Sequence, residues 1–279
     1  MSVKERHPAQ HTSSAESVSG TSQRQGVGMS LARVPYLNSV PFFRGLSLGR
    51  RYELVECVPR ELGIQAAAGE IMAGLLPLVD YIRLHDTFER IGHFGIAVRG
   101  RGRSVLLFSR RPIRQLDGSM ISITEETSTS AVLLQLLLER RYGVLPALYQ
   151  RGQRSEADAL LLIGDEALRF RAANTRYPYE IDLAFEWWLW QHLPCVFAVW
   201  AIRKDADSEE KKHLETALSR SLAVNAGRLE LIAQEYSNTL GVPTADLYAY
   251  LSAFIYRLSQ PEEEAIERFK GLADEHRLL

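Results

Sequence analysis

Tyr36-Leu37-Asn38-Ser39, followed by Pro41, is the stretch of this 279-residue sequence that most narrows its fold. The polar pair stands between an apolar run typical of a strand and a proline that can open a helix. Side chains at such a turn can bond to the local backbone or face a cleft, and both interpretations stay open for this pair. The stretch therefore predicts a strand-to-helix turn that carries polar groups.

The rest of the chain repeats this alternation of apolar runs and helical patterns, which is typical of parallel strand-helix units in an α/β fold. We expect strands at residues 31–37, 52–58, 72–79, 119–124, 158–163 and 194–202, and a hairpin or a pair of strands at 94–108. We expect helices at residues 41–48, 59–70, 130–142, 209–235, 244–258 and 261–276, and one that begins at Gly164.

The amino-acid composition changes near Pro112, which indicates a second lobe. The strand at 194–202 is expected to return the chain to the first lobe. The predicted domains are lobe I at residues 29–112 plus 200–279, and lobe II at residues 113–199. Two lobes joined by two crossings place a ligand cleft between them, because the carboxyl ends of parallel strands collect helix N-termini and backbone donors.

Three further segments are expected at this cleft, because each stands where a strand gives way to a turn, a helix or a second strand. They are residues 104–109, 128–130 and 163–168. Their shared placement with residues 36–39 groups the four as motifs of one site.

Composition excludes several classes of function. The formal net charge of −1 and the scattered arginines give no electrostatic footprint for nucleic acid. No run approaches the roughly 18 apolar residues of a membrane span. Residues 1–28 are polar and lack the apolar core of a secretory signal. We therefore expect a disordered tail at 1–28, a cytoplasmic protein and a small-molecule partner, whereas the sequence gives no indication of the oligomeric state.

The spacing of cysteines and histidines predicts neither a disulfide nor a metal site. Cys57 and Cys195 both stand in apolar or strand-like runs, so no zinc spacing can be read. The histidines form no i, i+4 pair with a third ligand, and residues 100–103 are too few for a phosphate loop. We expect no cofactor and no metal.

A run of hydroxyls at residues 127–130 precedes the strongly apolar helix expected at 130–142. One hydroxyl can simply cap the first turn, and the unpaired N–H groups together with the helix dipole can hold a carboxylate. Three consecutive hydroxyls exceed what capping needs, which favours a ligand. The candidate binding residues in this run are Ser128, Thr129 and Ser130.

Acidic residues near these motifs allow structural and functional interpretations. Glu125 and Glu126 would repel a bound anion, so we expect both to face solvent. Asp165 can be a helix N-cap, whereas Gly164 before it can permit close approach of a ligand.

Two alternative catalytic arrangements are less favoured. Asp182 and Glu186 would share a helix face and could act as an acid/base pair, although solvated charges are the simpler interpretation. No G-x-S-x-G elbow surrounds any serine, which argues against a nucleophilic hydrolase.

In this order the four motifs resemble the chorismate dehydratase family of the futalosine route to menaquinone. The similarity runs collinearly over about residues 31–203. The resemblance implies a two-lobed periplasmic-binding-protein-like type II fold with a ligand cleft between the lobes. It also implies a carbon-oxygen hydro-lyase that removes water from chorismate without a cofactor and gives 3-[(1-carboxyvinyl)oxy]benzoate.

The resemblance further implies roles for individual residues. Ser104, Thr129 and Ser130 would hold carboxylates, and Asn38 would lie near the departing hydroxyl or the side-chain carboxylate. The expected catalytic residues are Asn38 and Ser104. The expected substrate-binding residues are Ser39, Ser128, Thr129, Ser130, Gly164 and Asp165.

Several positions depart from the family pattern. Met72 stands where an Asp is usual, Ala184-Phe185 where Gly-Glu is usual, and Gln191-His192 where Thr-Gly is usual. These departures keep two alternatives open: a non-catalytic protein that binds or senses small carboxylates, and a paralogue that acts on another cyclic carboxylate. The sequence does not identify the proton acceptor.

Overall fold

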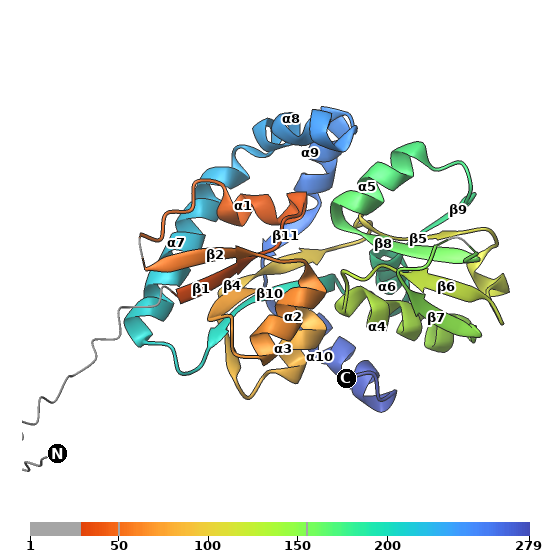
Figure 1. Ribbon diagram of the computed structural model, residues 1–279, viewed down its shortest axis with the longest axis horizontal. Helices are drawn as coiled ribbons and strands as arrows, with labels where there is room; N and C mark the ends of the chain where they lie inside the picture. The colour runs from red at the N-terminus through yellow and green to blue at the C-terminus, as the bar shows by residue number, and fades with distance from the viewer. Residues whose placement is uncertain (1–28, 50, 155) are drawn as a thin grey trace, which may run out of the picture.

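The computed structural model describes residues 29–279 apart from Arg50 and Ser155, and it shows two lobes side by side, each built around a sheet (Figure 1). The disordered tail expected at 1–28 lies outside the described residues.

Lobe I is organised around a six-stranded mixed sheet with the strand order β11-β4-β10-β3-β1-β2. Its strands are β1 (Met29–Arg33), β2 (Tyr52–Glu56), β3 (Ala73–Pro77), β4 (Phe88–Val98), β10 (Cys195–Arg203) and β11 (Phe254–Arg257). β1 pairs in parallel with β2 and β3, whereas β10 runs antiparallel between β3 and β4. The central β3 is buried along its whole length, as its apolar sequence predicts.

Lobe II is organised around a five-stranded sheet with the order β7-β6-β8-β5-β9. Its strands are β5 (Val105–Ser109), β6 (Met120–Ile123), β7 (Leu148–Arg151), β8 (Ala159–Ile163) and β9 (Tyr179–Asp182). β6 pairs in parallel with β7 and β8, and β5 runs antiparallel to β8 and β9. β5 and β8 are fully buried and form the centre of this lobe.

Helices cover both sheets and provide the turns that reach the space between the lobes (Figure 1). In lobe I they are η1 (Leu37–Ser39), α1 (Val40–Phe43), α2 (Pro59–Ala67), α3 (Leu78–Arg83), α7 (Ser208–Ala226), α8 (Leu229–Leu240), α9 (Thr244–Ser252) and α10 (Gln260–Glu275). In lobe II they are η2 (Ile113–Gln115), α4 (Thr129–Gln135), its π-helical continuation η3 (Leu136–Tyr142), α5 (Gly164–Ala173) and α6 (Leu183–Gln191). Among the described residues, none of these helices is long and apolar enough to span a bilayer.

Of the two alternatives expected at 94–108, the pair of strands is present and the hairpin is wrong, because β4 and β5 belong to different sheets. The segment between them, residues 99–104, is therefore the first crossing between the lobes, and the chain returns between α6 and β10. The expected boundaries at 112 and 200 were thus misplaced. β5 is an apolar strand like its predecessor, and the sequence carries no sign of the change of sheet.

The C-terminal helices differ from the expected pattern at two points. The helix expected at 209–235 breaks near Gly227 into α7 and α8. The helix expected at 244–258 ends at Ser252, and β11 follows as an edge strand paired with β4. Tertiary pairing, not local periodicity, decides the state of this last segment.

Candidate functional site

A cavity of about 70 Å³ lies between the lobes and is lined by residues from both. Its polar lining consists of Asn38, Ser104, Thr127, Thr129 and Ser130, joined by the backbone at Gly164. Its apolar walls and aromatic rings are Val34, Tyr36, Pro59, Leu75, Pro77, Ile96, Val105, Ile163, Phe197 and Ala198. Among the described residues that line it, none carries an ionisable acid or base other than the Tyr36 phenol. The cavity therefore offers neutral hydrogen-bond groups in an apolar surrounding.

The topology brings four separate motifs to this one cavity. Asn38 lies in η1, directly beyond β1, and Ser104 ends the first crossing just before β5. Thr129 opens α4 after β6, and Gly164 opens α5 after β8. Ser104 and Gly164 adjoin a strand, and Asn38 and Thr129 lie at the helical turns that follow β1 and β6, where the lobes meet. The common hollow expected from the sequence is present.

Ser39, next to Asn38, has a different position. Its hydroxyl donates to the carbonyl oxygen of Val34 at 2.6 Å and lies 2.8 Å from that of Tyr36, and its side chain is fully buried. Ser39 does not line the cavity. Its hydrogen bonds fix the strand-to-helix turn that presents Asn38.

Asp165 also lies outside the cavity lining and links the two lobes. Its Oδ1 accepts a hydrogen bond of 2.9 Å from the backbone N–H of Leu37 in lobe I. Burial raises the pKa of Asp165, and the Leu37 N–H partly offsets that rise. The residue holds η1 against the start of α5.

The hydroxyl residues at the start of α4 also differ in direction: some line the cavity and others do not. Thr129 Oγ1 accepts from the backbone N–H of Val79 in lobe I at 3.2 Å, which leaves its O–H free to donate into the cavity. Ser128 turns away from the cavity and donates to Asp80 of α3. Burial raises the pKa of Asp80, opposed by the Ser128 bond.

Tyr250 of α9 contacts Ser104 but does not itself line the cavity. No pattern in the sequence identified this residue. Its phenol donates to Ser104 Oγ at 3.0 Å, and its side chain is fully buried. Burial raises the pKa of Tyr250 well above its usual value, so the phenol stays protonated and donates. Because Ser104 accepts this bond, its own proton is available to a ligand in the cavity.

Position 164 requires a glycine for two reasons, its backbone conformation and the close approach of the Tyr36 ring. Its φ is +57°, and a Cβ atom there would lie 2.8 Å from the Tyr36 ring. The Tyr36 phenol in turn donates to Glu126 across the lobe junction. The expectation that Glu126 faces solvent is therefore wrong, because this carboxylate helps to join the lobes.

The alternative acid/base pair does not form at the cavity. Asp182 is a buried N-cap of α6, where it accepts from the N–H groups of Phe185 at 3.1 Å and Arg103 at 2.8 Å. Glu186 pairs with Arg141 and accepts from Tyr142. Neither acid lines the cavity, and the interpretation of both as solvated charges is also wrong.

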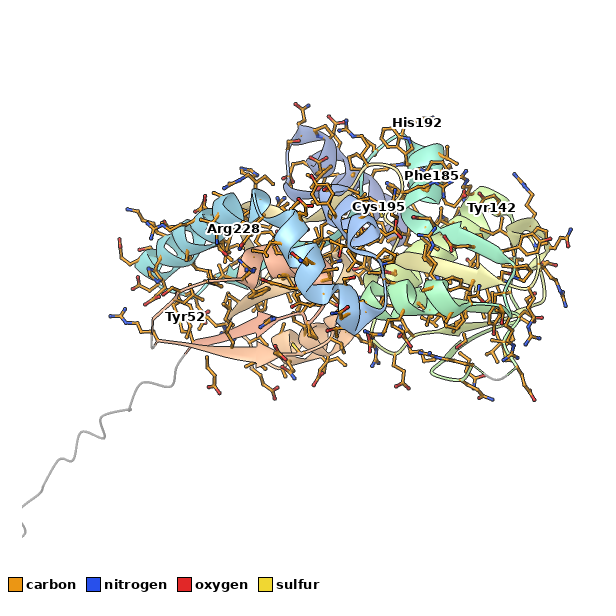
Figure 2. The ribbon with its side chains drawn as sticks, turned by 90° about the horizontal axis from the view of Figure 1, so that it is seen from above. Tyr52, Tyr142, Phe185, His192, Cys195 and Arg228 are labelled. Atoms are coloured by element: carbon orange, nitrogen blue, oxygen red, sulfur yellow. The ribbon has the colours of Figure 1, made fainter. Side chains whose placement is uncertain are left out.

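The departures from the family pattern lie outside the cavity lining as well. Phe185 stands on α6, where it stacks with the guanidinium of Arg101 at 4.3 Å. His192 ends α6 with a left-handed φ of 57°, a conformation that favours glycine. Figure 2 shows both near one edge of the molecule, where the lobes join. Met72 precedes β3 and bonds through its backbone to Ser30.

Comparisons with known proteins agree on family and fold. A family model described as "Menaquinone biosynthesis" matches residues 29–275. A chorismate dehydratase of Thermus thermophilus is 33% identical over 257 residues, which cover 84% of this chain and 91% of the relative. These matches span nearly all of the described chain.

Solved structures share the architecture at low identity. Protein AF1704 from Archaeoglobus fulgidus has a TM-score of 0.72 at 20% identity, covering 90% of this chain and 98% of that one. The alkanesulfonate-binding protein SsuA from Xanthomonas axonopodis pv. citri, bound to MOPS, has a TM-score of 0.65 at 13% identity, covering 90% and 94%. The expected periplasmic-binding-protein-like fold is confirmed, and with a family match over residues 29–275 the chain belongs to the menaquinone biosynthesis family.

Proposed function

We propose that this protein is a chorismate dehydratase, a hydro-lyase that eliminates water from chorismate to give 3-[(1-carboxyvinyl)oxy]benzoate. The observation that carries the proposal is the single cavity in which Asn38, Ser104, Thr129 and Ser130 meet. Support also comes from the Thermus thermophilus chorismate dehydratase, which matches most of the chain.

Neutral donors suit this reaction. The substrate loses a ring proton, the electron pair of that C–H bond enters the ring, and the neighbouring C–O bond breaks to release hydroxide, which takes up the abstracted proton and leaves as water. Negative charge develops on the ring and delocalises to the ring carboxylate, where fixed hydroxyl donors stabilise the transition state. The product ring is aromatic, so the enzyme has mainly to select which bond breaks.

The residues divide these tasks between the two lobes. Ser104, with its proton directed to the cavity by Tyr250, and the two hydroxyls at the start of α4 would hold carboxylates. Asn38 would contact the departing hydroxyl or the side-chain carboxylate from lobe I. A ligand gripped in this way touches both lobes, which favours their closure around it.

The proton acceptor in this scheme is the substrate itself. No carboxylate, histidine or lysine lines the cavity among the described residues. The enolpyruvyl carboxylate of chorismate can take the ring proton if the site holds it within reach, and such proximity can supply roughly 7–11 kcal/mol.

The cavity of about 70 Å³ is smaller than the roughly 300–1,000 Å³ of most small-molecule sites. A substituted cyclohexadiene would therefore require the lobes to part during binding. The contacts that must break include Leu37 with Asp165 and Tyr36 with Glu126. Opening must also separate Val79 from Thr129, Asp80 from Ser128 and buried apolar residues of the two lobes that pack in one cluster.

The departures that left substrate identity open do not alter this proposal. Phe185 and His192 modify the ends of α6, and Met72 modifies the start of β3, whereas none of the three lines the cavity. A non-catalytic carboxylate-binding protein would have no need for this combination. The cytoplasmic location expected from the sequence stays a prediction.

Incubation of the purified protein with chorismate tests the proposal. We expect a new aromatic absorbance and a product whose mass is lower by one water, with no added metal or cofactor. Unchanged chorismate, with binding still detected by calorimetry, would support the non-catalytic alternative. Absence of both turnover and binding would support the paralogue.

A further inference from the structure

A second hollow, of about 430 Å³, lies between α2 and α3 of lobe I and β6, α4 and β7 of lobe II, in the lower part of Figure 1. Its charged lining consists of Arg60, Arg83, Arg151 and Asp80. We call this hollow the arginine mouth. Three cations and one carboxylate line it, in contrast to the neutral cavity.

The arginine mouth and the cavity share a thin wall. Pro59 lines the cavity and its neighbour Arg60 lines the mouth. Thr127 and Thr129 line the cavity, whereas Ser128 between them lines the mouth. A separation of the lobes at this wall would connect the two spaces directly.

Arg60 and Arg151 stand on opposite lobes and interact with acids, Asp80 and Glu125 respectively, only through space and not by direct pairing. Within the described ranges, neither guanidinium forms an ion pair, whereas Arg83 pairs with Asp80 at 3.6 Å. Burial lowers the pKa of Arg151, and the charge of Arg60 lowers it further, only partly offset by Glu125. These two cations therefore repel each other across the junction.

The placement of Arg60 is also unfavourable for its own helix. It lies in the first turn of α2, where the helix dipole disfavours a cation. Its side chain is exposed, and its backbone N–H bonds to the carbonyl oxygen of Glu126 in lobe II at 2.9 Å. Apart from lowering the pKa of the buried Asp80, the charge at this position adds no evident stability to the fold.

We propose that the arginine mouth is the access route of the substrate, where Arg60 and Arg151 capture a small dicarboxylate before it reaches the cavity. This inference rests on the proposed function and deepens it. A dianion is attracted over long distances most strongly by net charge, and the side chains that line the cavity carry none. The mouth supplies that charge at the point where the lobes meet.

The same geometry couples capture to closure. An anion between Arg60 and Arg151 cancels their mutual repulsion, so the lobes approach more readily once the dicarboxylate is present. Arg151 also donates to the carbonyl oxygens of Thr124 at 3.1 Å and Thr127 at 2.9 Å. Because Thr127 lines the cavity, Arg151 connects the mouth to the cavity wall.

Steady-state kinetics with chorismate at several salt concentrations tests this inference. We expect Arg60→Gln to lower kcat/KM about three- to tenfold at low salt, with kcat unchanged and a weaker salt dependence. Arg60→Glu should lower kcat/KM further, and Arg60→Lys should restore most of it. Thermal stability should not fall in any of them.

Two further comparisons separate charge from structure. Arg151→Lys and Arg151→Gln both lose the planar guanidinium, so the larger loss of kcat/KM in Arg151→Gln measures the charge. Arg228→Gln is the matched control, because Arg228 is exposed at the start of α8, on the side of lobe I opposite to α2 (Figures 1 and 2).

The outcomes distinguish the two proposals. If the wild-type protein makes product but Arg60→Gln matches Arg228→Gln in kcat/KM and in salt dependence, the access route is wrong and the proposed function stands. If kcat falls instead of kcat/KM, Arg60 acts after binding and the capture role is also wrong. If the wild-type protein makes no product, the proposed function fails and the access route fails with it.

Discussion

Polar residues that face the cavity alternate along the chain with polar residues that brace its walls. Asn38 faces the cavity and Ser39 braces the turn, while Thr129 faces it and Ser128 bonds to Asp80. The two groups contain similar residue types. The direction of each side chain decides whether the residue lines the cavity or stabilises its wall. The comparison predicts that cavity-facing changes affect turnover, whereas bracing changes affect stability.

The largest effect is expected from Asn38→Asp. A carboxylate there would repel the dianionic substrate and lose the amide donor, so kcat/KM should fall by about 10²–10³-fold. The unfolding midpoint should stay near that of the wild type, because the half-buried Asn38 side chain forms no hydrogen bond within the described part of the chain. Ser39→Ala is the matched bracing variant and should show the reverse pattern. Equal turnover in Asn38→Asp and the parent would remove Asn38 from the site.

Gly164→Ala should cause the next largest effect, on stability. The new methyl would meet the Tyr36 ring and also strain a left-handed backbone. Gly241→Ala is the control, because Gly241 has a similar φ of +65° with open space around it. We expect denaturant unfolding to show that Gly164→Ala costs about 1–3 kcal/mol more than Gly241→Ala. Equal costs would show that the contact with Tyr36 is not required.

Tyr250→Phe should have an intermediate effect on turnover. Loss of the phenol leaves Ser104 free to rotate, so we expect kcat to fall about tenfold while stability falls by roughly 1 kcal/mol. Tyr256→Phe is a suitable control, because the buried Tyr256 hydroxyl has no partner among the described residues. A kcat of Tyr250→Phe equal to that of Tyr256→Phe would contradict the role of Tyr250.

The smallest effect concerns the pH dependence of stability through Asp165. Burial raises its pKa in the folded state above the value of about 4 in the unfolded chain. Its contribution to stability is therefore full at low pH and declines as pH rises through the folded-state pKa. Asp165→Asn cannot ionise, so its free energy of unfolding should lack this decline. Parallel pH profiles for the two proteins would show that the carboxylate is not destabilised by burial.

Sequence reasoning predicted the architecture because its signals are local. Apolar runs such as 158–163 and the helix beginning at Gly164 are present where they were expected. The change of sheet between β4 and β5 was not predictable, because pairing partners are distant in sequence. The edge strand β11 was missed for the same reason.

The candidate site was predictable in part. The strand-to-turn positions correctly indicated Asn38, Ser104, Thr129, Ser130 and Gly164 as neighbours in space. Periodicity could not show that Ser39, Ser128 and Asp165 point elsewhere, because direction depends on atoms of the other lobe. Tyr250 gave no signal, since a tyrosine within an apolar helical pattern is typical of a core.

A crystal structure of the protein with 3-[(1-carboxyvinyl)oxy]benzoate bound would decide whether these residues form the site. We expect one product molecule between the lobes, with Asn38 and Ser104 contacting it and a carboxylate about 3 Å from the hydroxyls of Thr129 and Ser130. A product bound elsewhere, or one whose carboxylates are held by charged side chains and not by these four residues, would contradict this expectation.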